Sequence, residues 1–72
     1  MDNKFKTQLT KMLIASAEAD KSKALLTLEL LANHPAGIGD HSTDDFYKNA
    51  EEAIEALADA DDKLEAIQKY LI

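Results

Sequence analysis

The fold of this chain is decided by the stretch His34-Pro35-Ala36-Gly37-Ile38-Gly39-Asp40-His41-Ser42, which holds its only proline, both glycines and both histidines. Pro35 ends a helix, because the residue before a proline is pushed out of helical geometry. Gly37 and Gly39 permit the positive φ angles of a turn, and Ser42 is a good N-cap for a following helix. The stretch is therefore predicted to be the corner of a helical hairpin.

The segments on either side of this loop both have helical sequences. They are rich in Ala, Leu, Glu and Lys and poor in β-branched residues, a composition typical of helices. We expect a first helix over about 3–33, a loop over 34–42 and a second helix over about 43–71. The chain, residues 1–72, is then one all-α domain: an antiparallel, coiled-coil-like two-helix hairpin.

Heptad spacing predicts which faces of the two helices meet. In the second helix the apolar positions form an unbroken seam: Phe46, Ala50, Ala53, Leu57, Ala60, Leu64, Ile67 and Leu71. In the first helix the corresponding seam is Phe5, Leu9, Met12, Ala19, Leu26 and Leu30, interrupted by Ser16 and Lys23. In an antiparallel hairpin the two seams match layer by layer, from Leu30–Phe46 to Phe5–Leu71.

Apolar residues that this seam leaves over predict self-association. They are Leu13, Ala17, Ala24, Leu28 and Leu31 in the first helix, with Ile54 beside the seam of the second. A lone hairpin could not cover them, and large exposed apolar patches usually mark an interface. We expect these residues to form the interface of a homodimer with the architecture of a four-helix bundle. A different protein, or a larger homo-oligomer, is the alternative.

The charge of the chain limits the classes of partner that it is expected to bind. Its net charge is −6, which argues against binding to nucleic acid or to an anionic membrane. Residues 43–72 carry nine acids against three lysines, most simply read as a solvated outer face. The alternative is an acidic mimic of nucleic acid that inhibits a DNA-binding protein. Without a signal core or a membrane span of roughly 20 apolar residues, the expected location is the cytoplasm.

The loop contains the only candidates for a metal site. His34, Asp40 and His41 offer nitrogen and oxygen ligands of the kinds that divalent metals accept, but their spacing matches no established framework. The chain has no cysteine, which excludes thiolate sites and disulfides. We therefore expect no resident metal or cofactor, and keep a metal-responsive hairpin as an alternative.

Catalysis has little support in the sequence. Ser42 or Thr43 beside His41 would need an orienting acid in a geometry that sequence neighbours rarely reach, and a hairpin offers no deep pocket. The Gly37-Ile38-Gly39 segment lacks the lysine and the preceding strand of a phosphate-binding loop. We predict that the protein is not an enzyme.

The loop also carries a resemblance. The residues Asn33-His34-Pro35-Ala36-Gly37-Ile38-Gly39-Asp40-His41 resemble an N-x-P-x-G-I-G-[DE]-H stretch in short, uncharacterised helical proteins of tailed phages, notably myophages of marine cyanobacteria. Those proteins look like two helices around this loop, so the resemblance would span most of the chain. It implies a small accessory phage protein in the host cytoplasm and transfers no catalytic residue.

Overall fold

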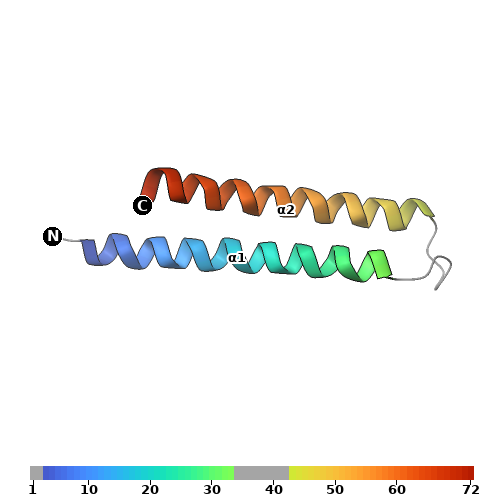
Figure 1. Ribbon diagram of the computed structural model, residues 1–72, viewed down its shortest axis with the longest axis horizontal. Coiled ribbons are helices and arrows are strands. Elements are labelled where there is room, and N and C mark those ends of the chain that lie inside the picture. The colour runs from blue at the N-terminus through green and yellow to red at the C-terminus, as the bar shows by residue number, and fades with distance from the viewer. Residues whose placement is uncertain (1–2, 34–42) are drawn as a thin grey trace.

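The protein is a hairpin of two long α-helices. The structure is a computed structural model. It describes residues 3–33 and 43–72, and within these ranges it describes the side chains from Thr7 onward. Helix α1 spans Asn3–Asn33 and helix α2 spans Thr43–Leu71. The two helices lie side by side and antiparallel (Figure 1). The prediction of an all-helical hairpin is confirmed, and the expected ranges were 3–33 and 43–71.

The hairpin is a thin rod. Its Cα trace extends 58 × 15 × 14 Å, with a radius of gyration of 16.6 Å. A compact domain of this length would have a radius of gyration of about 11 Å. Each helix therefore has one neighbour along its length, and most of its circumference faces outward.

Local signals support the two ends of α2 that the structure describes. Asp44 and Asp45 lie in its first turn and Lys69 in its last. The negative charges are therefore at the positive end of the helix dipole and the positive charge is at its negative end, and both interactions are favourable. In the last turn of α1 the amide Nδ2 of Asn33 donates a hydrogen bond to the carbonyl oxygen of Glu29 at 3.0 Å. These contacts add to helices whose main support is their packing against each other.

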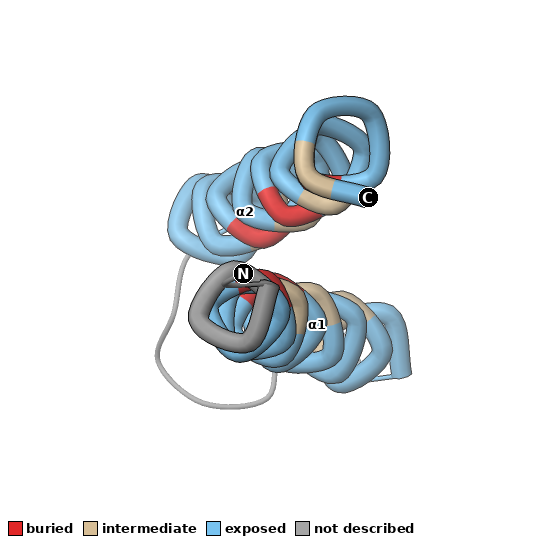
Figure 2. Tube along the Cα trace, turned by 90° about the vertical axis from the view of Figure 1, so that its left-hand side faces the viewer, coloured by how far each residue is buried: buried red, intermediate tan, exposed pale blue. Residues whose placement is uncertain are grey.

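The core between the helices is built from small side chains. Within the described side chains, the buried residues are Thr10, Ala17 and Ala24 in α1 and Ala53, Ala60 and Ile67 in α2. They lie on the facing sides of the two helices (Figure 2). On each helix they are seven residues apart, so an antiparallel alignment places Thr10 by Ile67, Ala17 by Ala60 and Ala24 by Ala53. Alanine at these positions lets the two backbones approach closely.

The seam of α2 is the one that its heptads predict. Ala53, Ala60 and Ile67 are buried, and Ala50, Leu57, Leu64 and Leu71 are half-buried. Phe46, at the start of the seam, is 39 % exposed. Because α2 has a single unbroken apolar seam, its sequence favours one orientation of that helix against α1.

The predicted seam of α1 is wrong. Leu9, Met12, Leu26 and Leu30 are exposed, as are Ser16, Ala19 and Lys23 between them. The face packed on α2 is instead the stripe expected to form a dimer interface. It contains the buried residues Ala17 and Ala24 with four half-buried neighbours, Ile14, Lys21, Leu28 and Leu31.

Two physical reasons favour this orientation of α1. Alanine opposite alanine permits a close approach that leucine opposite alanine would prevent. The expected seam would also press Ser16 and Lys23 against α2, where polar groups lose their hydration. In the observed seam the charged member is Lys21, whose Nζ lies 3.2 Å from Oδ1 of Asp61, with both side chains partly exposed.

Candidate functional site

The residues singled out from the sequence differ in where they lie and in how far they are buried. His34, Asp40 and His41 lie outside the described residues. Of the expected interface residues, Ala17 and Ala24 are buried inside the hairpin, so they are not available to a second molecule, and Leu28 and Leu31 are half-buried beside them. Leu13 and Ile54 remain 40 % and 50 % exposed.

The most prominent exposed apolar feature is on α1, and we call it the outer stripe. It consists of Leu9, Met12, Ser16, Ala19, Lys23, Leu26 and Leu30. Its four large apolar side chains are between 54 % and 61 % exposed. Steps of three and four residues separate its members, so they line one face of the helix. These are the residues that the heptad pattern had placed in the hairpin core.

The outer stripe faces away from α2. Leu26 follows the buried Ala24 by two residues, which is about 200° around a helix axis. Met12 stands in the same place relative to the buried Thr10, whereas Leu9 and Leu30 directly precede Thr10 and Leu31 and so lie about 100° from them. Helix α1 is therefore apolar on two separate sides, more than a right angle apart on average, and α2 covers one of them.

The outside of α2 has the opposite character. Its acids Asp44, Asp45, Glu51, Glu52, Glu55, Asp59, Asp61, Asp62 and Glu65 are all exposed. By contrast, Lys23 is the one charged residue of the outer stripe. The hairpin thus has an apolar edge along α1 and an acidic edge along α2.

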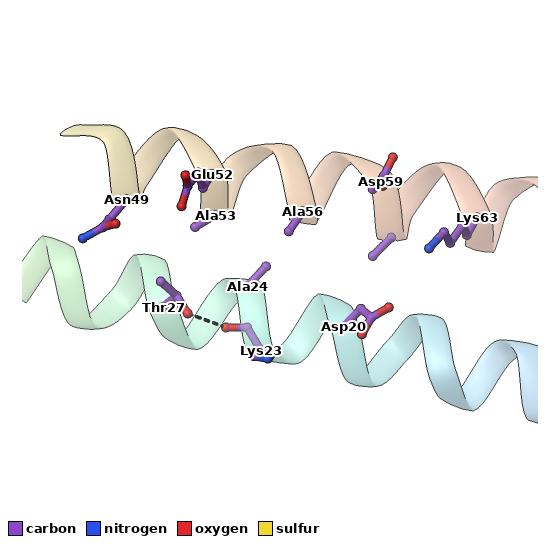
Figure 3. A pocket seen from close by; sticks show the side chains of 11 residues that line it. Asp20, Lys23, Ala24, Thr27, Asn49, Glu52, Ala53, Ala56, Asp59 and Lys63 are labelled. Atoms are coloured by element: carbon purple, nitrogen blue, oxygen red, sulfur yellow. Dashed lines mark hydrogen bonds between the residues drawn. The ribbon is translucent and has the colours of Figure 1, made fainter. Parts of the chain in front are cut away.

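One open groove runs along the side of the hairpin between these two edges. Its larger part has a volume of about 380 Å³, and its floor includes Ala24, Ala53 and Ala56 (Figure 3). Charged side chains at its rim come from both helices, among them Asp20 and Glu52. The nearby hydroxyl of Thr27 donates to the carbonyl oxygen of Lys23 at 2.9 Å. The groove continues past Lys63 toward Leu13 and Ile67.

This groove is open to solvent along its length. Its polar side chains stand on an open rim above a floor of methyl groups, so water is not excluded from them. Across residues 3–33 and 43–72, no three histidine, cysteine or acidic side chains come together as metal ligands would. In the described part of the chain, neither helix is sufficiently long and apolar to cross a membrane.

No protein-family model, curated protein or solved structure matches the chain. Any inference about function therefore depends on the geometry of the outer stripe and on the charges around it. The heptad pattern had assigned these apolar side chains to the hairpin core, and the structure leaves them exposed. The signal that could have corrected it is the seven-residue series Thr10, Ala17, Ala24, Leu31, whose small members match the alanines of α2.

Proposed function

We propose that this protein is a non-catalytic interaction module that forms a homodimer through the outer stripe of α1. Two hairpins then make a four-helix assembly. The observation that carries the proposal is the row of large apolar side chains on α1 that α2 leaves exposed. Large apolar side chains that recur along one face of a helix are typical of a surface that is covered by another helix.

The energy available from covering the stripe is comparable to the cost of association. Full burial of a leucine or methionine side chain contributes about 1.5–3 kcal/mol, and the four large side chains of the stripe are little more than half exposed. Four side chains from each of two molecules would therefore contribute roughly 6–12 kcal/mol. Association costs about 4–15 kcal/mol. We expect a reversible dimer whose population changes with concentration.

The small core of the hairpin also favours association. Its buried side chains are mostly alanines, and each buried methyl group contributes only about 0.8 kcal/mol. Chains of this length usually need a disulfide, a metal or a second copy to be stable. This chain has no cysteine, and a second copy would supply the missing apolar contact.

The experiment is sedimentation equilibrium of the wild type, Leu26→Glu and the matched control Leu25→Glu. Leu25 is 47 % exposed and Leu26 54 % exposed, but Leu25 lies about 100° away around the helix. Leucine and glutamate have similar helix propensities. We expect Leu26→Glu to weaken the dimer at least 100-fold and Leu25→Glu to weaken it less than tenfold. A monomeric wild type, or equal effects of the two substitutions, would contradict the proposal.

A second candidate function is mimicry of nucleic acid by the acidic edge of α2. The observation in its favour is that all nine acids of α2 are exposed. Against its three lysines they leave a net six negative charges on 29 residues, or about one per 7 Å of helix. Duplex DNA carries one per roughly 1.7 Å, so the mimic would be a dilute one. It predicts binding to a basic DNA-binding protein that falls steeply with salt, and salt-independent binding would exclude it.

The biological setting that we propose is that of a small accessory protein of a tailed phage, in the host cytoplasm. Its support is the resemblance of residues 33–41 to the loop of such proteins. Genomic context tests it directly. A gene surrounded by phage structural and replication genes is expected, and a gene in a host chromosome with no phage genes nearby would contradict it.

A further inference from the structure

We infer that the two hairpins pair through their outer stripes in antiparallel orientation, with the twofold axis beside Ser16 and Ala19. The four helices then stand in one row, in the order α2, α1, partner α1, partner α2. This inference rests on the proposed homodimer and adds its orientation, its register and its overall arrangement. It differs from the compact bundle expected from the sequence.

The sizes of the side chains along the stripe set the register. Large residues stand at both ends, Leu9 and Met12 at one and Leu26 and Leu30 at the other, with Ser16 and Ala19 near the middle. The members of the stripe are separated by alternating steps of three and four residues. In an antiparallel pair, a residue that follows a three-residue step faces a partner residue that follows a four-residue step. The centred register therefore sets Leu9 against the partner's Leu26 and Ser16 against the partner's Ala19. Small residues meet at the axis, where the backbones can approach closely.

The single charge of the stripe decides the orientation. In a parallel pair each residue faces its own copy, so Lys23 would meet the partner's Lys23 inside an apolar seam. Two like charges at that separation repel, and the repulsion is strongest where water is excluded. In the antiparallel register Lys23 lies against the partner's Met12, and the two lysines are on opposite sides of the axis. The lysine stem can pack on methionine while its ammonium group reaches water.

The position of the stripe around α1 decides the arrangement. A compact four-helix bundle needs each helix to contact two neighbours roughly at right angles. In α1 the members of the outer stripe lie either about 200° from a neighbouring buried residue, as Leu26 does from Ala24, or about 100°, as Lys23 does, so on average the stripe is turned from the seam by more than a right angle. A row of four helices follows. It also places the two acidic α2 helices at the far edges, where their like charges are as distant as the assembly allows.

The first test uses engineered cysteines, because the chain has none of its own. Leu9→Cys and Leu26→Cys proteins are mixed, dimerised and oxidised, and the products are identified by mass spectrometry. Disulfides require two Cα atoms within about 7 Å, so the antiparallel register predicts the mixed 9–26 product in excess. The matched control is Leu9→Cys mixed with Leu25→Cys, which should cross-link at least tenfold less.

The alternatives give different products. Disulfides formed mainly within the Leu9→Cys or the Leu26→Cys protein alone would show a parallel pair and overturn the inference. Equal yields from the 9–26 and 9–25 mixtures would overturn the register. If sedimentation equilibrium shows the wild type to be a monomer, the proposed function itself fails, so the two failures are distinguishable.

The second test does not need a disulfide. The variant Met12→Glu places a carboxylate against the partner's Lys23 in the antiparallel register, whereas Leu9→Glu places one against the partner's Leu26. We expect Met12→Glu to weaken the dimer at least tenfold less than Leu9→Glu, measured by sedimentation equilibrium at low salt. In a parallel pair both variants would face their own copies. Equal weakening would therefore overturn the inference.

Discussion

The replacement Ala17→Leu tests the alanine seam most directly. Ala17 is 2 % exposed and Ala60, on the facing helix, is 1 % exposed. Leucine adds three carbon atoms where the two backbones come together, so it must push the helices apart or adopt a strained rotamer. Overpacking of this kind costs about 1–3 kcal/mol. The helix propensities of alanine and leucine are nearly equal, so the loss comes from packing alone.

The matched control is Ala58→Leu, at an exposed alanine of α2. It should change the free energy of unfolding by less than about 0.5 kcal/mol. The assay is thermal and urea unfolding followed by far-UV circular dichroism, with all proteins at one concentration. For a domain of this size each kcal/mol lowers the melting temperature by about 4–8 °C, so Ala17→Leu should melt well below the control.

A double-mutant cycle identifies the contact. If Ala17 faces Ala60, Ala60→Gly makes room for the new leucine. The double variant should then be more stable than the sum of the single changes by roughly 0.5–3 kcal/mol, after the helix penalty of glycine cancels in the cycle. Equal unfolding of Ala17→Leu and Ala58→Leu, or additivity within experimental error, would refute the packing described here.

Two further predictions follow from the same packing. Ile67 is 8 % exposed and Ile54 50 % exposed, so Ile67→Ala should destabilise the protein by about 2–5 kcal/mol and Ile54→Ala by much less; equal losses in urea unfolding would contradict the orientation of α2. The Lys21–Asp61 ion pair lies in a partly exposed setting, so Asp61→Asn should cost at most about 1 kcal/mol. That loss should shrink as salt is added, and a large, salt-independent loss would show that the pair acts as a buried contact.

The sequence was sufficient to predict the hairpin and the face of α2 that packs on α1, for two reasons. Pro35 and the two glycines mark a single corner, and α2 has a single unbroken apolar seam. The orientation of α1 could not be predicted in the same way, because apolar residues line two sides of it, and the alanines Ala17 and Ala24 mark the side that packs on α2. Choosing the seam by size favoured Leu9 and Leu26, whereas close packing against Ala53 and Ala60 requires Ala17 and Ala24.

Two residues of the predicted interface, Ala17 and Ala24, lie inside the hairpin for the same reason. Once Ala17 and Ala24 are buried against α2, the residues left for another molecule are those first assigned to the core. A surplus of apolar side chains on α1 was correctly inferred from the sequence. Which half of the surplus stays outside depends on how closely two particular backbones approach, and heptad spacing alone carries no information about that distance.

The rod shape of the hairpin has a practical consequence for work in solution. Its radius of gyration of 16.6 Å is that of a compact domain of roughly 200 residues. On a size-exclusion column, which separates particles by size rather than by mass, a single hairpin would therefore elute ahead of a globular standard of its own mass. Elution volume alone would therefore overestimate the mass of a single chain. Light scattering and sedimentation equilibrium, which weigh the particle, are the methods that distinguish an elongated monomer from an assembly.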